Sequence, residues 1–323
     1  MRHPFNWRTV SDKLKPTFYM AITEQQLLTW SNLGATVAST NTYNSIKAAI
    51  DDIKWIKEVK YDTYLQGSYR NFTNIRGDSD VEVIAQLTSI FQYDNSSLSQ
   101  EQSSMFQEVY SKGANFSLND FRQATFKGLQ DYYGKQNVSL GSKAIDVVGF
   151  NGRLNADVLC CIEFRKYKSF SKANSQDYFS GIKFYSTNES RWVISYPKLH
   201  YHNGVNKNSQ DRTNGNYKPV TRIFKNIKLY LVQKNIISKN LAPSYFIQCL
   251  LYNLPHNLFK GNSYQSILVQ LLNGLVASTN NNQLKDYICQ HRQLELFGKA
   301  KEQWNVNDAI AFIKVIIELY KNW

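Results

Sequence analysis

The segment LQGSYRNFTNIRGDSDVEV, residues 65–83, joins a glycine-serine turn to a strand that carries two acids. Its end has a strand pattern, because apolar side chains at Val81 and Val83 alternate with other residues. Asp80 and Glu82 are two positions apart, so their side chains leave the same face of that strand. Two carboxylates so placed repel one another unless a cation offsets their charge. The segment therefore predicts a site for divalent cations.

The turn at the start of the segment adds a place for a phosphate. Gly67 lets the backbone approach a ligand closely, and the following N–H groups and the Ser68 hydroxyl offer donors to an oxyanion. A Gly-Ser pair alone is mostly structural, and an acid-x-acid pair alone is mostly a solvated strand face. The combination, with eleven residues between Gly-Ser and Asp-x-Glu, is more specific. It resembles the signature of polymerase-beta-type nucleotidyltransferases.

A third carboxylate is expected from a neighbouring strand. Residues 154–161 read LNADVLCC, and Asp157 is the only acid in this mostly apolar run. A lone charge is costly to bury, so Asp157 is expected to bind a metal ion or to pair with a base. Asp80, Glu82 and Asp157 together are the predicted catalytic and metal-binding residues of a nucleoside triphosphate site.

The composition indicates a globular chain with a positive net charge. The chain has 323 residues, of which 42% are hydrophobic, a mean hydropathy of -0.45 and a formal charge of +13. It has no window of about 18 apolar residues and no apolar leader core, so we expect a cytoplasmic protein without a membrane partner. The four cysteines lack C-x-x-C spacing, which predicts neither a disulfide framework nor a zinc site. Lys and Arg are spread without long runs, which favours a basic nucleotide cleft over a nucleic-acid stripe.

Two lobes are expected after an N-terminal extension. Residues 1–19 precede a second methionine and are expected to be poorly ordered. Residues 20–195 are predicted to form a catalytic lobe of α+β class, with a long helix or two helices in series followed by a mixed sheet with helices on one side. Within it, residues 165–176 are rich in Lys and Ser and are predicted to be a loop. Residues 196–323 have apolar side chains at three- and four-residue steps, which predicts a helical lobe.

Several motifs occur in the order found in the bacterial cGAS/DncV-like nucleotidyltransferases, and the chain most resembles clade E (CdnE) of that family. The motifs are YLQGSYRNFTNIRGDSDV at 64–81, ADV and RKY within 156–167, YPKLH at 196–200, and APSYF and LLYN within 242–253. The resemblance implies a polymerase-beta-type sheet lobe packed against a mostly helical lobe, with the active site in the cleft between them. It also implies a template-independent enzyme that joins and cyclises two nucleoside triphosphates. Such enzymes make the second messengers of anti-phage CBASS systems.

The resemblance implies a metal cofactor for the three acids. Asp80, Glu82 and Asp157 match the family's acids, which bind two Mg²⁺ ions, with Mn²⁺ as a possible substitute. Glu82 stands where close relatives often have Asp, a change that the chemistry tolerates because either carboxylate reaches the ion.

The resemblance also implies a set of nucleotide-binding positions. They are Gln66, Gly67, Ser68, Ser195, Lys225, Ser244 and Tyr245. Residues 66–68 match the triphosphate turn, Lys225 and Ser244 match groups on the donor's outer phosphates, and Tyr245 matches an aromatic that stacks on the donor base. From sequence alone, Lys225 also fits a solvated helix face and Tyr245 also fits a core aromatic.

Ser195 bears on the product. It precedes the YPKLH motif, at a position that lines the base pocket in clade E, where an Asn is associated with a preference for uracil. Serine is shorter and offers one hydroxyl in place of an amide's paired donor and acceptor. We therefore expect a cyclic dipurine made from ATP, GTP or both.

Two alternatives and several partner expectations accompany this prediction. The nearer alternative is a pyrimidine-containing cyclic dinucleotide or a cyclic mononucleotide of UMP or CMP. The other is a nucleotidyltransferase that binds RNA or tRNA, for which the positive charge is the only support. The family's animal relative binds DNA through a zinc insertion, and this chain has no matching His-Cys-Cys-Cys cluster, so no DNA activator is expected. A CBASS effector is expected to bind the product and not the protein, and a monomer is favoured.

Overall fold

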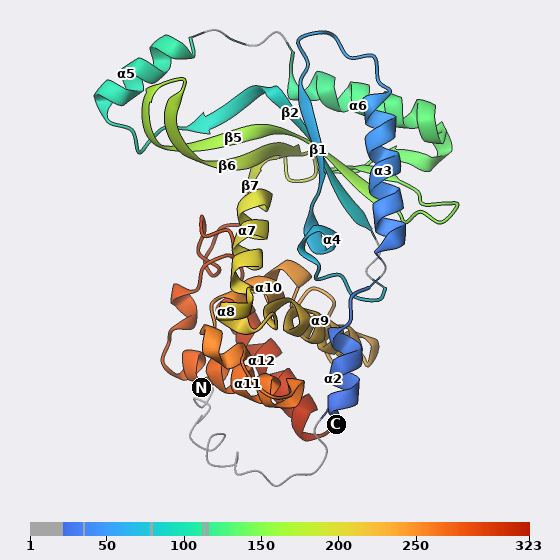
Figure 1. Ribbon diagram of the computed structural model, residues 1–323, viewed down its shortest axis with the longest axis vertical. Helices are drawn as coiled ribbons and strands as arrows, with labels where there is room; N and C mark the ends of the chain where they lie inside the picture. The colour runs from blue at the N-terminus through green and yellow to red at the C-terminus, as the bar shows by residue number, and fades with distance from the viewer. Residues whose placement is uncertain (1–21, 35, 78–79, 112, 114–115) are drawn as a thin grey trace. The chain divides into compact units, whose positions relative to one another are not determined.

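The computed structural model describes residues 22–34, 36–77, 80–111, 113 and 116–323 (Figure 1). The predicted extension, residues 1–19, lies outside the described residues. Contacts divide the chain into two compact units. The sheet unit is Leu33–His202, and the helical unit combines the described residues before Leu33 with Asn203–Trp323. The predicted α+β class is confirmed.

The elements follow this division. The sheet unit contains α3 (Val37–Asp51), β1 (Tyr61–Leu65), α4 (Gly67–Asn71), β2 (Val81–Asp94), α5 (Gln100–Val109), α6 (Leu118–Tyr133), η1 (Lys135–Asn137), β3 (Val138–Leu140), β4 (Ile145–Val147), β5 (Ala156–Lys172), β6 (Ser175–Ser186) and β7 (Arg191–Ser195). The helix α7 (Pro197–Lys207) crosses the boundary after His202. The helical unit contains α2 (Glu24–Ser31), α8 (Gln210–Thr213), α9 (Tyr217–Gln233), α10 (Ser244–Tyr252), η2 (His256–Phe259), α11 (Tyr264–Asn280), η3 (Leu284–Asp286) and α12 (Val306–Lys321).

One mixed sheet of seven strands organises the described part of the sheet unit. The strand order is β1-β2-β5-β4-β3, and β6 pairs with β5 while β7 pairs with β6. β2 and β5 run parallel, whereas the other neighbouring pairs are antiparallel. The long β5 is therefore flanked by β2 on one edge and by β4 and then β6 on the other.

One face of this sheet is covered by α3 and α6, which Figure 1 shows beside the strands. Val81 and Val83 of β2 and Val158 of β5 belong to one buried cluster with Ile46 of α3 and Phe121 of α6. Because side chains alternate along a strand, the residues between these valines point to the other face. The core thus fixes which face of β2 and β5 is free to carry polar groups.

The predicted loop at 165–176 is wrong, because β5 and β6 continue through it as a long hairpin. The exposed Lys and Ser side chains of this segment hide the strand pattern. Its apolar side chains pack against α5, where Phe106 forms a buried cluster with Tyr167 and Phe170. That partner helix is distant in sequence, so its contribution is not visible in the local pattern.

The first helix packs in a different unit from the one predicted. Of the two predicted alternatives, the structure has two helices in series, α2 and α3, but α2 belongs to the helical unit and not to the predicted lobe 20–195. Arg222 Nε donates to the Ser31 carbonyl at 2.6 Å, and the Glu24 carboxylate accepts the Tyr264 N–H at 2.8 Å. The predicted boundary at 196 also differs, since the contacts divide the chain within α7. Among the helices that the structure describes, none is long and apolar enough to cross a bilayer.

Candidate active site

Glu82 and Asp157 occupy matching positions on the two parallel strands. Glu82 of β2 pairs in register with Asp157 of β5, which puts their Cα atoms about 4.8 Å apart. Paired residues on neighbouring strands point to the same face. Their neighbours Val81 and Ala156 face the core under α3 and α6, so both acids point to the opposite face. The sheet therefore brings together two carboxylates that are 75 positions apart in the chain.

Asp80 precedes β2 directly and adds a third carboxylate. Its Oδ1 atom is buried and has no hydrogen-bond partner among the described residues. Asp157 is half-buried, and its pKa is raised, first by burial and then by the negative charges of Asp80 and Asp146. Both observations describe carboxylates that lack a compensating positive group, which is unfavourable in a protein interior.

Asp146 is an acid that the sequence analysis did not identify. It lies on β4 and pairs in register with Asp157, so it shares the face of the sheet that carries Glu82. Its flanking residues Ile145 and Val147 are buried, which is the alternation of a strand with one polar face. This alternation identifies Asp146 in the sequence as a residue on the polar face of a strand. Only the pairing of β4 with β5 shows that this residue lies beside Asp157.

The glycine-serine turn contacts Glu82. Gly67 has φ of +67°, which strains any other residue, and a Cβ atom there would lie 2.6 Å from Glu82 Cδ and so would displace this carboxylate. The Gln66 N–H donates to the Glu82 carbonyl at 2.9 Å, and the Gln66 side-chain amide donates to the Glu82 carboxylate at 3.4 Å. The turn that offers N–H donors and the strand that offers carboxylates are therefore in direct contact.

The acids fit a divalent cation by charge and by donor type. Carboxylate oxygens are the ligands that hard divalent ions prefer, and no described residue donates a hydrogen bond to the buried Oδ1 of Asp80. In the part of the chain that the structure describes, no three carboxylate, imidazole or thiol groups converge into a complete ligand set. Mg²⁺ is usually bound through one or two carboxylates together with substrate phosphates. An incomplete protein ligand set is thus consistent with a site that a nucleotide completes.

Ser195, at the end of β7, points to the same face as the acids. It pairs with Ile182 of β6, which pairs with Glu163 of β5. Glu163 lies an even number of positions after Asp157, so all of these side chains share one face. About 20 Å of β5 separates Glu163 from Asp157. Ser195 therefore shares the face of the acids but does not adjoin them.

The remaining predicted residues belong to the helical unit. Lys225 lies on α9 and is 2% exposed, so the alternative of a solvated helix face is wrong. Ser244 and Tyr245 begin α10. Tyr245 is 37% exposed as a residue, and its ring stacks on Trp304, with ring centres 5.7 Å apart and planes at 22°. Tyr245 is thus not a fully buried core aromatic.

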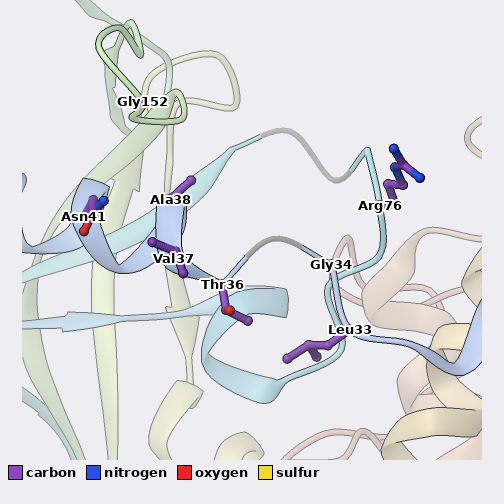
Figure 2. A pocket seen from close by; sticks show the side chains of 8 residues that line it. All are labelled: Leu33, Gly34, Thr36, Val37, Ala38, Asn41, Arg76 and Gly152. Atoms are coloured by element: carbon purple, nitrogen blue, oxygen red, sulfur yellow. The ribbon is translucent and has the colours of Figure 1, made fainter.

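A hollow of about 650 Å³ lies in the sheet unit beside the start of α3, as Figure 2 shows. Its lining residues are Leu33, Gly34, Thr36, Val37, Ala38, Asn41, Arg76 and Gly152. The predicted site residues are all absent from this lining. The hollow is therefore separate from the acids, the turn and Ser195.

Comparison with known proteins gives consistent matches. Residues 202–321 match the family described as cGAS/DncV-like nucleotidyltransferase C-terminal helical domain. A cyclic UMP-AMP synthase of Rhodothermus marinus is 42% identical over 94% of this chain and 99% of its own. The cyclic nucleotide synthase CdnE01 of Staphylococcus haemolyticus is 38% identical over 94% of this chain and 100% of its own.

Solved structures agree with these matches. The Rhodothermus marinus CdnE c-UMP-AMP synthase, solved with Apcpp and Upnpp, has a TM-score of 0.82 at 40% identity and covers 94% of this chain and 97% of its own. The similarity extends over nearly the whole length of each protein, across the sheet unit as well as the helical unit. The chain therefore belongs to the cGAS/DncV-like nucleotidyltransferase family, as a cyclic nucleotide synthase of the CdnE type.

Proposed function

We propose that this chain joins two nucleoside triphosphates without a template and cyclises the product to a cyclic dinucleotide. The observation that carries the proposal is the in-register pair of Glu82 and Asp157, next to Asp80 and the Gly67 turn. This arrangement suits phosphoryl transfer because it combines carboxylates for cations with N–H donors for phosphates. Direct attack of one nucleotide on the other needs no covalent intermediate with these residues.

The three carboxylates have the same role in both phosphoryl transfers, the joining of the two nucleotides and the cyclisation. Enzymes of this family generally use a divalent metal, and we propose two Mg²⁺ ions, or Mn²⁺ in their place, held by Asp80, Glu82 and Asp157. When bound, the ions make the acceptor 3′-hydroxyl more acidic and neutralise charge on the phosphates. The carboxylates contribute by fixing the acceptor hydroxyl near the donor's α-phosphate, which lowers the entropic part of the barrier.

The reaction requires two transfers at the same residues. In the first, the acceptor 3′-oxygen bonds to the donor's α-phosphorus, the bond to pyrophosphate breaks and the hydroxyl proton is lost. In the second, the free hydroxyl of the linear intermediate attacks its remaining triphosphate in the same way, and a second pyrophosphate leaves. The linear intermediate must therefore change its orientation in the site between the two transfers. This requires binding contacts that release and form again.

The nucleotide-binding residues have complementary roles in this proposal. Gly67 and Ser68 bind the triphosphate through backbone and hydroxyl donors, and Gln66, whose N–H donates to the Glu82 carbonyl, contributes its side-chain amide. Lys225 and Ser244 bind its outer phosphates, for which a buried ammonium supplies charge and a hydroxyl supplies a directional donor. The Tyr245 ring, already stacked on Trp304, offers a flat surface to the donor base.

For the product we propose a cyclic dipurine. Ser195 is half-buried and points to the face of the acids, and its single hydroxyl replaces an amide that is matched to uracil. A second candidate, a uracil-containing cyclic dinucleotide, is favoured by the 42% identity with a protein named cyclic UMP-AMP synthase. The two candidates differ in the base that the pocket at Ser195 selects. We further propose that the chain acts as a monomer and that a separate CBASS effector reads the product.

The test uses the full chain with all four NTPs, each labelled in turn, and Mg²⁺. The expected product carries label from ATP or GTP, resists phosphatase and forms without added RNA or DNA. The variant Ser195→Asn should gain incorporation of UTP, and Ser195→Ala serves as the matched control that removes the hydroxyl without adding an amide. Label from UTP in the wild-type product would overturn the dipurine proposal. Product from the double variant Asp80→Ala, Glu82→Ala would overturn the site.

A further inference from the structure

The turn at Gly67 and Ser68 continues into α4, a helix of five residues. A helix this short is not stable alone, so contacts with the rest of the protein must hold it in place. On one side Tyr69 is buried in the cluster under α3 and α6. Within the turn, the Asn71 amide donates to the Gly67 carbonyl at 2.7 Å. These contacts fix the inner side of the turn.

The outer side of α4 is held by Arg70. Its guanidinium carbon lies 4.0 Å from the centre of the Tyr201 ring, in the first half of α7. Arg70 is exposed and Tyr201 is half-buried, and both belong to the sheet unit. A cation that stacks on a ring face at this distance is attracted by the ring's quadrupole. Arg70 thus attaches the turn to α7.

The same half of α7 is attached to β1 by a second contact of this kind. Lys198 Nζ lies 4.6 Å from the centre of the Tyr64 ring and 3.5 Å from the Asp62 carboxylate. Beyond His202 the helix continues in the helical unit, where Lys207 Nζ donates to the Leu254 carbonyl at 2.7 Å. Arg70 therefore connects the glycine-serine turn to a helix that is part of both units.

We propose that Arg70 is a positioning residue that holds the Gly67–Ser68 turn against α7 by stacking on Tyr201, and so sets the affinity for the nucleoside triphosphate. This inference rests on the proposed function, in which the turn binds the triphosphate. It assigns the effect of Arg70 to the ring under it and not to direct attraction between its charge and the phosphates. The two explanations differ in whether removal of the Tyr201 ring matters.

A double-mutant cycle tests the inference. The variants are Arg70→Met, Tyr201→Leu and the two combined, and the readouts are KM for the nucleotide, kcat, the Kd of a non-hydrolysable triphosphate and the melting temperature. Each single variant is expected to raise KM and Kd about two- to fivefold, the range of an exposed cation–aromatic contact, with kcat and melting temperature little changed. The combined variant should lose no more affinity than either single variant.

Conservative variants and a charge control complete the design. Tyr201→Phe keeps the ring and should match the wild type, and Arg70→Lys keeps a cation and should fall between wild type and Arg70→Met. Arg191→Met, on β7, removes the same charge from the sheet unit and should leave Kd unchanged. A Tyr201→Leu variant with wild-type Kd, or losses that multiply in the combined variant, would show that the ring is not involved and would overturn the proposal.

Failure of this inference is distinguishable from failure of the proposed function. If Asp80→Ala abolishes product while the cycle shows no coupling, the positioning role of Arg70 is wrong and the function stands. If Asp80→Ala retains product, the proposed site itself is wrong.

Discussion

The two units hold charge of opposite sign in different surroundings. In the sheet unit, Asp80 precedes β2 directly, and Glu82 and Asp157 lie on the face of β2 and β5 opposite α3 and α6, where Glu82 is exposed. In the helical unit, Lys207 and Lys225 are 3% and 2% exposed within packed helices. Strand alternation alone decides the face of the sheet to which the acidic side chains point. The burial of the lysines depends instead on helices that are far apart in sequence. Local pattern therefore reveals the acids more readily than the buried cations.

The buried lysines also differ from one another. Lys207 donates to the Leu254 carbonyl, and its ammonium lies 4.9 to 5.6 Å from the ring centres of Phe259, Tyr252 and Tyr217. These contacts satisfy the Lys207 side chain inside the unit, although its burial lowers its pKa and so disfavours its charged form. We therefore assign Lys207 to the stability of the helical unit and keep Lys225 as the residue for the triphosphate.

The largest expected effect comes from the acid in the middle of the set. Asp157→Asn keeps the shape of the side chain but removes its charge, so kcat should fall roughly a hundredfold or more. The melting temperature should not fall, because the change also removes repulsion with Asp80 and Asp146. Initial rates and thermal unfolding measure the two quantities. Asp146→Asn is the matched control and should cost much less activity; equal losses in both variants would remove the distinction between the acids.

A smaller effect is expected from the buried cation in the second unit. Lys225→Met keeps most of the side-chain volume and removes the charge, so KM for the nucleotide should rise about tenfold or more. Lys228→Met, on the same helix, provides the control for loss of net charge. Steady-state kinetics with ATP and GTP measure both variants. Unchanged KM in Lys225→Met would make this lysine structural, like Lys207, and would end the contrast between them.

The last effect concerns stability and pH and leaves catalysis unchanged. Burial, followed by the positive charge of Arg212, lowers the pKa of Lys207 from 10.5 to about 7. Between these two values the unfolded chain binds a proton that the folded chain does not, so this lysine makes the free energy of unfolding rise with pH. The rise from pH 7 to pH 9.5 amounts to at most about 3 kcal/mol. Urea unfolding of wild type and Lys207→Met at both pH values measures it, and an equal pH dependence in the two proteins would contradict the assignment.

Much of the sheet unit follows from local pattern. Ser117, three residues before an acid, fits the capping pattern at the start of α6, and its side chain accepts from the Asp120 N–H as the first residue of a capping box. The strand start at Val81 and the lone acid at Asp157 likewise follow from alternation of apolar residues. The register that sets Glu82 beside Asp157 does not follow from either strand alone, because it is fixed by pairing across 75 positions.

Features that depend on distant partners were not predictable. The hairpin of β5 and β6 needs α5 to cover its apolar side chains, and α2 is placed by contacts with α9 and α11 near the other end of the chain. Asp146 lies on the short strand β4, and its place beside Asp157 follows only from the pairing of β4 with β5. Lys207 looks like an ordinary surface lysine until Tyr217, Tyr252 and Phe259 close around it.

The central claim is that Asp80, Glu82 and Asp157 act as one cation-binding set. The most direct test is Mn²⁺ binding, measured by electron paramagnetic resonance with a non-hydrolysable triphosphate present, because it does not depend on turnover. We predict tight Mn²⁺ binding by the wild type that is lost in the Asp80→Ala, Glu82→Ala variant and reduced in Asp157→Asn, whereas Asp146→Asn retains it. Binding that is equal in all four proteins would contradict the account.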